Sequence, residues 1–281
     1  MKSDQVTVIK PPRGWFDFHL SEIWRYRDLL TLFVMRDIKV RYKQTLLGPT
    51  WIILQPLALT AVFTIVINGF AGVSTGGRPA PIFYFTALII WSYFSQNVYS
   101  TSQLFVANEQ MFNKIYFPRM IVPISSLISN GAAVAFQFIA VLVFFIWYQI
   151  NGQVDGLFWR LLFFPLIVIQ VAAFSLGVGL CLAASTSKYR DISRVTPFLL
   201  QIWMFVTPVI YPFSAVPEKY RLLLSVLNPL AVFVEESRWC FFGESIIGFW
   251  QIAASLLTTV LVGIIGVLLF QRVERTVMDT I

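Results

Sequence analysis

The stretch MIVPISSLISNGAAVAFQFIAVLVFFIWYQINGQV, residues 120–154, contains no Asp, Glu, Lys, Arg or His. About 20 mainly apolar residues are enough for a helix to cross the hydrocarbon core of a bilayer, so this stretch predicts a membrane-spanning helix. Five further stretches without such residues occupy positions 44–77, 79–108, 161–187, 195–217 and 245–271. The sequence therefore predicts an all-α membrane protein with six transmembrane helices.

The composition argues against a soluble fold. Hydrophobic residues make up 57% of the chain and charged residues 12%, whereas soluble domains have roughly 45–50% and about 25%. The net charge is +7, but the basic residues stand between apolar stretches instead of forming one patch. Their placement predicts contact with membrane lipids and no binding of nucleic acid.

Prolines interrupt the fifth span and the segment after it. Pro208 and Pro212 limit the continuous helix of the fifth span to about residues 196–207, because proline lacks the N–H that a helix interior needs. The next apolar run, residues 222–234, is broken by Asn228-Pro229 and is too short to cross a bilayer. Short re-entrant helices or a hairpin on the outer surface are therefore expected between spans 5 and 6.

Residues 22–43 mix apolar and basic side chains before the first span. Arg36, Lys39 and Lys43 are spaced three or four residues apart and share one helical face, and Arg41 adds to the charge. The pattern predicts an amphipathic interface helix on the anionic inner leaflet, where each nearby basic residue contributes roughly 1 kcal/mol. A solvated helix end is the alternative.

The distribution of basic residues predicts the orientation. With the N-terminus in the cytoplasm, 16 of the 21 Lys and Arg residues fall in cytoplasmic segments, as the positive-inside rule requires. Both termini are then cytoplasmic, and the number of crossings is even. We expect a cytoplasmic segment 1–47 that includes the interface helix, a permease domain of six helices at 48–272, and a cytoplasmic tail at 273–281.

The spans lack the groups that several kinds of membrane protein require. Their central portions hold no charged residue and no histidine, which argues against an ion-coupled carrier and against acid–base catalysis in the membrane. His19 is the only histidine, and Cys181 and Cys240 are far apart, so neither a metal site nor a catalytic site is predicted. A phosphate-binding Gly-rich loop is also lacking, so another polypeptide would have to hydrolyse any nucleotide.

Aromatic residues are frequent within the spans. Tyr and Trp combine an apolar face with a polar group, which suits a conduit for sugar rings better than one for ions. Lipid-facing bulk and interfacial belts are the alternative and explain most of these residues. The candidates for lining a channel are Trp51, Phe63, Phe94 and Trp203.

Five motifs in a fixed order resemble one known family. They are RDIKVRYK at 36–43 with LGPTW at 47–51 and QP at 55–56, KIYFPR at 114–119 with Pro123, KYRDI at 188–192, TPVIYP at 207–212, and NPL at 228–230. Together they resemble type-2 ABC transporter permeases that export polysaccharides and polyol phosphates. The resemblance extends from about residue 20 to residue 272.

The resemblance implies a homodimer of six-helix subunits in the bacterial inner membrane. Each copy would dock on a separate ATPase subunit, which binds ATP and Mg²⁺, and the complex would export a lipid-linked glycan. O-antigen, capsule and wall teichoic acid exporters share the motifs, with O-antigen the leading expectation. A membrane-embedded transferase or scramblase that acts on lipid-linked sugars without ATP is the alternative.

The resemblance also implies roles for individual residues. Residues 109–119 would form a coupling helix in the ATPase, with 188–194 as a second contact, and short gate helices would follow the fifth span. Positive-inside anchoring is the alternative role for Lys114 and Arg119. The implied coupling residues are Glu109, Phe112, Lys114, Tyr116, Phe117, Arg119, Arg190 and Asp191, and the implied gate residues are Pro208, Tyr211, Pro212, Asn228 and Pro229.

Overall fold

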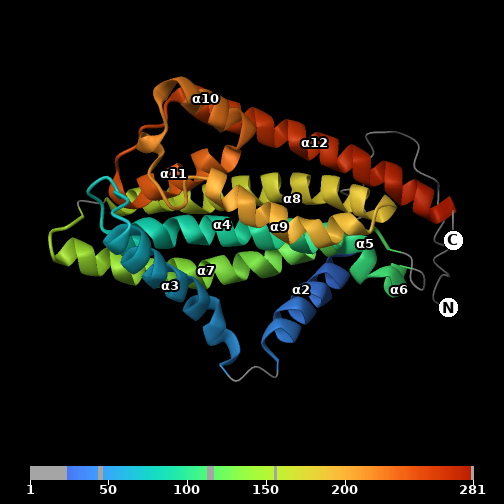
Figure 1. The fold of residues 1–281 in the computed structure, drawn as a ribbon. Helices are drawn as coiled ribbons and strands as arrows, with labels where there is room; N and C mark the ends of the chain where they lie inside the picture. The colour runs from blue at the N-terminus through green and yellow to red at the C-terminus, as the bar shows by residue number, and fades with distance from the viewer. Residues whose placement is uncertain (1–23, 44–46, 113–116, 155–156, 280–281) are drawn as a thin grey trace.

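The computed structural model describes residues 24–43, 47–112, 117–154 and 157–279. Every regular element in these ranges is a helix, and they contain no strand, which confirms the predicted all-α fold. The long helices α4, α7 and α8 run side by side, and α12 runs along the same bundle, as Figure 1 shows.

The elements follow the chain in a simple order. The longer α-helices are α2 (Arg27–Tyr42), α3 (Trp51–Val62), α4 (Ala80–Ser102), α7 (Ile121–Ile150), α8 (Phe164–Lys188), α9 (Asp191–Val206), α10 (Glu218–Leu227), α11 (Pro229–Phe242) and α12 (Phe249–Asp279). The short elements are η1 (Gly48–Thr50), η2 (Phe63–Phe70, a π-helix), α5 (Leu104–Ala107), α6 (Glu109–Phe112), η3 (Phe158–Phe163) and η4 (Phe213–Ala215).

Helix α4 forms the centre of the bundle. It packs against α3, α7, α8, α9 and α11, and the side chains from Ile82 to Ile90 are almost completely buried. Much of this core is aromatic; for example, Phe94 stacks on Phe174 of α8 with ring centroids 5.6 Å apart. Helix α4 is therefore surrounded by protein, although its sequence alone resembles a lipid-facing span.

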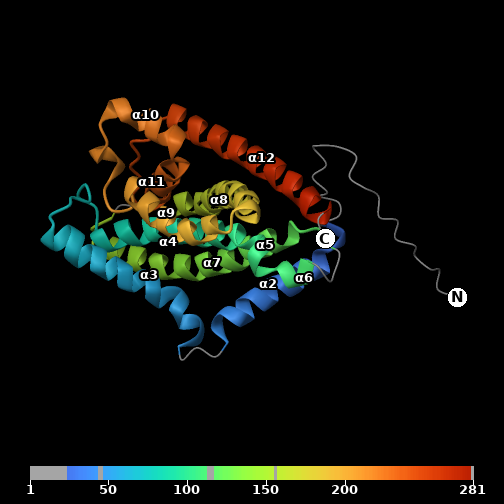
Figure 2. The same cartoon turned by 45° about the vertical axis from the view of Figure 1, so that its right-hand side comes forward.

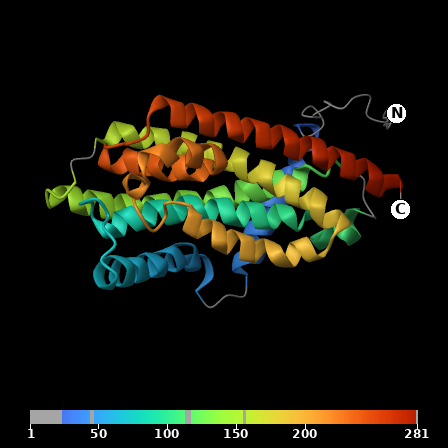
Figure 3. The same cartoon turned by 45° about the horizontal axis from the view of Figure 1, so that its top comes forward.

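Helices α3 and α12 lie on opposite sides of the bundle (Figure 3). On the α12 side, Gly177 of α8 faces Gly263 and Gly266 of α12, where a Cβ added at Gly177 would lie 2.8 Å from the Gly263 nitrogen. Small residues let membrane helices approach this closely. On the other side, α2 and α3 diverge from the bundle as a V, which Figure 2 shows from a second angle.

Within the described residues, four stretches are long and apolar enough to cross a membrane: Gly48–Phe70, Ile121–Ile150, Phe158–Lys188 and Phe249–Glu274. Helix α4 has 23 residues but is more polar, and α9 has 16 residues. The predicted count of six spans depends on these two helices and stays a prediction.

Prolines end or divide helices where the sequence predicts it. Helix α9 stops at Val206, before Pro208, and α10 and α11 are separated at Asn228-Pro229. Helix α9 begins at Asp191, before the predicted start at about residue 196. Asp191 lies in the first turn of α9, where its negative charge interacts favourably with the helix dipole and so favours this earlier start.

Candidate functional site

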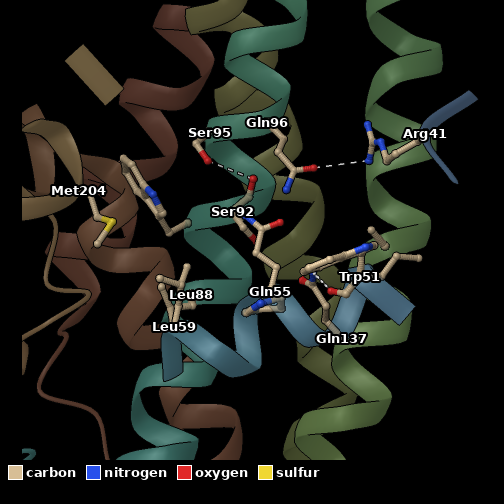
Figure 4. A pocket seen from close by; sticks show the side chains of 14 residues that line it. Arg41, Trp51, Gln55, Leu59, Leu88, Ser92, Ser95, Gln96, Gln137 and Met204 are labelled. Carbon is tan, nitrogen blue, oxygen red and sulfur yellow. Dashed lines mark hydrogen bonds between the residues drawn. The ribbon is translucent and has the colours of Figure 1, made fainter. Parts of the chain in front are cut away.

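A cavity whose wall includes several polar side chains opens on the α3 side of α4. It has a volume of about 580 Å³ and is bounded by α3, α4 and α7, with Arg41 at the end of α2 and Met204 of α9 at its edges. Figure 4 shows Gln55, Gln96, Gln137 and Trp51 around this space, while the Ser95 hydroxyl donates to the Ser92 oxygen of its own helix. The residues that give it polar or aromatic character are Arg41, Trp51, Gln55, Trp91, Ser92, Ser95, Gln96 and Gln137.

A second depression continues from the first along α4. It measures about 550 Å³, shares Trp91, Ser95, Gln96 and Met204 with the first, and extends to Gln201 of α9. Ser92, Ser95 and Gln96 place polar groups on α4 between α3 and α9, whereas the second depression is lined mainly by apolar surface. The outer faces of α3 and α9 are apolar and exposed.

A proline in α3 explains one of the amides in the wall. Pro56 has no N–H, so the carbonyl of Ile52 loses its normal helical partner. Gln137 of α7 replaces that partner by donating from Nε2 to the Ile52 oxygen at 2.9 Å. Its Oε1 is buried and has no hydrogen-bond partner among the described residues, so Gln137 presents an unused acceptor beside the cavity.

One of the four aromatic residues expected to line a channel lies at the cavity. Trp51 is half exposed and belongs to the wall. Phe94 is completely buried in the core, and Phe63 packs edge-on against Tyr84 at 5.7 Å. Trp203 packs on Phe94 and lines neither of the two cavities. In this conformation the last three therefore stabilise the bundle and do not line the cavity.

The residues expected in the interface helix lie on α2, apart from Lys43, which ends it. Arg36 pairs with Asp37 at 2.8 Å and lies over the Phe33 ring, and Lys39 is exposed. Arg41 differs because it turns toward the bundle, where Nη2 donates to Asn130 Oδ1 at 2.6 Å. Helix α2 also packs on α7, so part of its apolar face is covered by protein.

An aromatic cluster occupies the end of the bundle where α5 and α6 lie. The ring of Phe112 is 5.7 Å from that of Phe117, Phe117 is 5.7 Å from Phe33 of α2, and the Arg119 guanidinium lies over Phe112. Phe270 of α12 belongs to the same buried cluster. Of the expected coupling residues in this segment, Phe112, Phe117 and Arg119 thus pack within the chain.

Arg190 and Asp191, two further expected coupling residues, lie outside this aromatic cluster. Arg190 and Asp191 are exposed at the start of α9. The first turns of α9 are tied to the end of α4, because Gln103 Nε2 donates to the Ser193 oxygen at 3.1 Å. That carbonyl is available because Pro197, four residues later, has no N–H. Lys114, Tyr116 and the side chain of Glu109 lie outside the described residues.

Asn228, one of the expected gate residues, links the end of α9 to the segment that follows it. Its Oδ1 accepts from Trp203 Nε1 at 3.1 Å, and its Nδ2 donates to Thr207 Oγ1 at 2.9 Å. The end of α9 is thereby fixed to the junction of α10 and α11. Pro208, Tyr211 and Pro212 lie in the loop that follows α9, Tyr211 donates to the Val206 oxygen at 2.9 Å, and Pro229 begins α11.

The structure contains a buried ionic cluster of Arg78, Glu235 and Arg238 that the sequence did not predict. Glu235 is paired with Arg78 at 3.1 Å and with Arg238 at 3.2 Å. Arg238 is completely buried, donates to the Val209 oxygen at 3.0 Å, and lies 3.5 Å from the Phe83 ring centroid. Arg78 and Arg238 are among the five basic residues outside the predicted cytoplasmic segments. The spacing of Glu235 and Arg238, three residues apart in a mainly apolar stretch, is a signal of internal pairing.

Comparison with known proteins decides the family. The sequence pattern of ABC-2 type transporters matches residues 28–242. The chain belongs to the ABC-2 type transporter family. Matched residues extend from α2 through α11, so the cavity, the ionic cluster and most of the aromatic cluster lie inside this ABC-2 region, whereas Phe270 of α12 lies beyond it.

Several curated relatives of this ABC-2 chain are export proteins. It is 30% identical over 75% of its length to the O-antigen export system permease protein RfbA of Myxococcus xanthus, covering 79% of that protein. It is 26% identical over 88% to an RfbA of Klebsiella pneumoniae, covering 92% of it. It is 25% identical over 73% to the polysialic acid transport protein KpsM of Escherichia coli, covering 77% of it.

Proposed function

We propose that this protein is the membrane-spanning permease subunit of an ATP-driven exporter that moves a lipid-linked polysaccharide across the bacterial inner membrane. The observation that carries the proposal is the cavity on α4, whose wall contains amide, hydroxyl and guanidinium groups, in a chain that belongs to the ABC-2 family. O-antigen is the favoured cargo because relatives named O-antigen export permeases align over most of the chain. Capsule or teichoic acid would require the same kind of path.

A second copy of the chain completes the path in this proposal. The helices that border the cavity expose large apolar side chains, including Leu59 and Val62 of α3 and Phe198 and Ile202 of α9. An exposed apolar face next to a polar cavity suits a partner subunit better than lipid, since lipid would also cover the polar groups. The subunit then has six spans, cytoplasmic termini, α2 as the interface helix, and α10 and α11 as gate helices.

ATP hydrolysis is assigned to a separate subunit, with two copies in the complex. Residues 109–119 and 188–194 are its proposed docking surfaces. Support comes from the aromatic cluster, since Phe112 and Phe117 join the proposed coupling segment to α2 and α12. A push on this segment would therefore reach the interface helix directly. A transferase or scramblase without ATP finds less support, because the relatives are named as export and transport proteins.

Deletion of the gene in its native bacterium tests the proposal. We expect the surface polysaccharide to be lost while lipid-linked polymer accumulates inside the cell, and the wild-type gene to restore export. Ser95→Phe places a bulky ring where the two cavities meet, so it should reduce surface polysaccharide about tenfold or more. The matched control is Ile139→Phe, which adds a ring at an exposed position on α7 and should export normally.

Three results would contradict the proposal. Normal surface polysaccharide in the deletion strain would exclude the export function. Equal export by Ser95→Phe and Ile139→Phe, at equal membrane levels, would exclude the α4 cavity as the path. ATP hydrolysis that is independent of this chain in the purified complex would contradict coupling.

A further inference from the structure

Among the described residues that line the α4 cavity, Arg41 is the only charged one. Its Nη2 donates to Asn130 Oδ1 at 2.6 Å, and its Nη1 makes a longer contact of 3.5 Å with Gln96 Oε1. Asn130 in turn donates from Nδ2 to Asn97 Oδ1 at 2.7 Å. Three neutral amides on α4 and α7 thus hold one guanidinium in place, as Figure 4 shows for Gln96 and Arg41.

The charge of Arg41 has no carboxylate partner in the described part of the chain. None of the ion pairs found there includes Arg41, and Asp37, one turn earlier on α2, is paired with Arg36. A guanidinium has five N–H donors, and the two contacts to amides leave most of them available. A cation that is positioned but not neutralised favours an anionic ligand, because a bidentate contact with phosphate is the geometry it matches best.

The cavity wall next to Arg41 has the chemistry of a sugar site. The unused Oε1 of Gln137 is buried, and the amides of Gln55 and Gln96 and the indole of Trp51 lie around the same space (Figure 4). Amides bind hydroxyl groups in either direction, and an indole offers a flat apolar face to a sugar ring. Gln137 is 5% exposed, and its unpaired Oε1 lies buried within the wall, where a turn of the side chain would bring it to a hydroxyl donor.

We propose that this cavity binds a sugar that carries a phosphate, with Arg41 holding the phosphate and Gln55, Gln96 and Gln137 holding the sugar. The inference rests on the proposed function, because it names the part of the exported molecule that the subunit recognises. A lipid-linked glycan and a free sugar phosphate both present the same phosphate ester to Arg41. Asn130 is a positioning residue, since it touches Arg41 and not the ligand.

Binding to the full chain in lipid nanodiscs tests the inference. The probes are glucose 1-phosphate, a polyprenyl-phosphate-linked glucose incorporated in the nanodisc, and glucose as the uncharged control. We expect the phosphorylated probes to bind and glucose to bind at least tenfold more weakly. Arg41→Gln should weaken phosphate binding about tenfold or more, as expected for a lost charge-assisted contact, while Arg41→Lys should retain part of it.

A matched control separates a specific site from general attraction to a basic helix. Lys39→Gln removes the same charge from the same helix, but Lys39 is exposed and does not line the cavity. The Lys39→Gln variant should bind both phosphorylated probes with the affinity of the wild type. An equal loss of affinity in Lys39→Gln and Arg41→Gln would show that the helix merely attracts anions, and would overturn the proposal.

Asn130→Asp provides a second test, because it should change phosphate binding only if the charge of Arg41 holds the phosphate. The new carboxylate would lie against Arg41 and neutralise it, so the phosphate should be excluded although the shape of the site is kept. Asn97 can accommodate the change because its buried Nδ2 has no partner now and can turn toward the carboxylate. We expect Asn130→Asp to keep the thermal stability of the wild type and to lose at least tenfold in affinity.

The probes also identify the source of the phosphate. Binding of the lipid-linked probe alone supports a lipid-linked ligand, binding of glucose 1-phosphate alone supports a free sugar phosphate, and binding of both supports recognition of the shared group. Wild-type affinity in both Arg41→Gln and Asn130→Asp, or no binding of either phosphorylated probe, overturns the inference. Export can persist in that case, so this failure is distinct from failure of the proposed export function.

Discussion

Glu235 carries the negative charge of the buried ionic cluster, and its loss should destabilise the protein. It is 1% exposed and contacts both Arg78 and Arg238, so Glu235→Gln leaves two guanidinium groups without their counter-charge. We expect a loss of about 3–5 kcal/mol in the free energy of unfolding, as for a broken buried ion pair. The measurement is the thermal midpoint of the purified protein in nanodiscs.

A neighbouring pair with the same spacing gives the control. Glu218 and Arg221 on α10 are also three residues apart, but the Glu218 side chain is 89% exposed. Glu218→Gln should cost less than about 1 kcal/mol, because water screens the charges of an exposed pair. Equal thermal midpoints for the two variants would show that the Glu235 pairs contribute no more than a surface pair.

At the scale of elements, the contact between α8 and α12 depends on glycine. A Cβ added at Gly266 would lie 2.4 Å from the Gly177 oxygen, whereas a Cβ at Gly263 would meet nothing within 4 Å. Gly266→Ala should therefore push the helices apart and cost about 1–3 kcal/mol, as overpacking usually does. Thermal unfolding in nanodiscs measures the effect.

Gly263→Ala is the matched variant on the same helix. Alanine is the better helix former by about 1 kcal/mol, so this variant should be as stable as the wild type or slightly more stable. A loss of stability in Gly263→Ala equal to that in Gly266→Ala would mean that helix α12 does not pack on α8 in this register.

At the scale of the whole molecule, the orientation in the membrane can be measured directly. The loop with Ser74 and the turn at Tyr189 lie at opposite ends of the bundle (Figure 1), separated along the chain by α4, α7 and α8. With Cys181 and Cys240 replaced by alanine, Ser74→Cys should react with a membrane-impermeant thiol reagent in intact cells. Tyr189→Cys, which is also exposed, should react only after the membrane is permeabilised.

Two other labelling results would contradict the predicted topology. Reaction of Tyr189→Cys alone in intact cells would reverse the orientation predicted from the basic residues. Reaction of both would place the two loops on the same side and would exclude an odd number of crossings between them. Either result would require a topology other than six spans with cytoplasmic termini.

The positions of the helices were predictable, while their surroundings were not. Hydropathy reports the cost of placing a segment in an apolar environment, and lipid and protein interior are both apolar. The sequence could therefore locate α4 but could not show that it is the central helix. For the same reason Phe94 was expected in a channel but lies in the core, and Phe112, expected to anchor a partner, packs on Phe117.

The all-α architecture, the breaks at Pro208 and Asn228-Pro229, and the family were predictable, because they follow from local composition and from motifs in order. The packing of the helices, in contrast, decides how the freed carbonyls of Ile52 and Ser193 are satisfied, by Gln137 and Gln103. It also decided that Arg41, unlike Lys39, turns into the cavity. The partners in these three contacts lie 85 to 90 residues apart in the sequence. The spacing of polar and apolar residues along the chain does not show which distant side chain completes such a hydrogen bond.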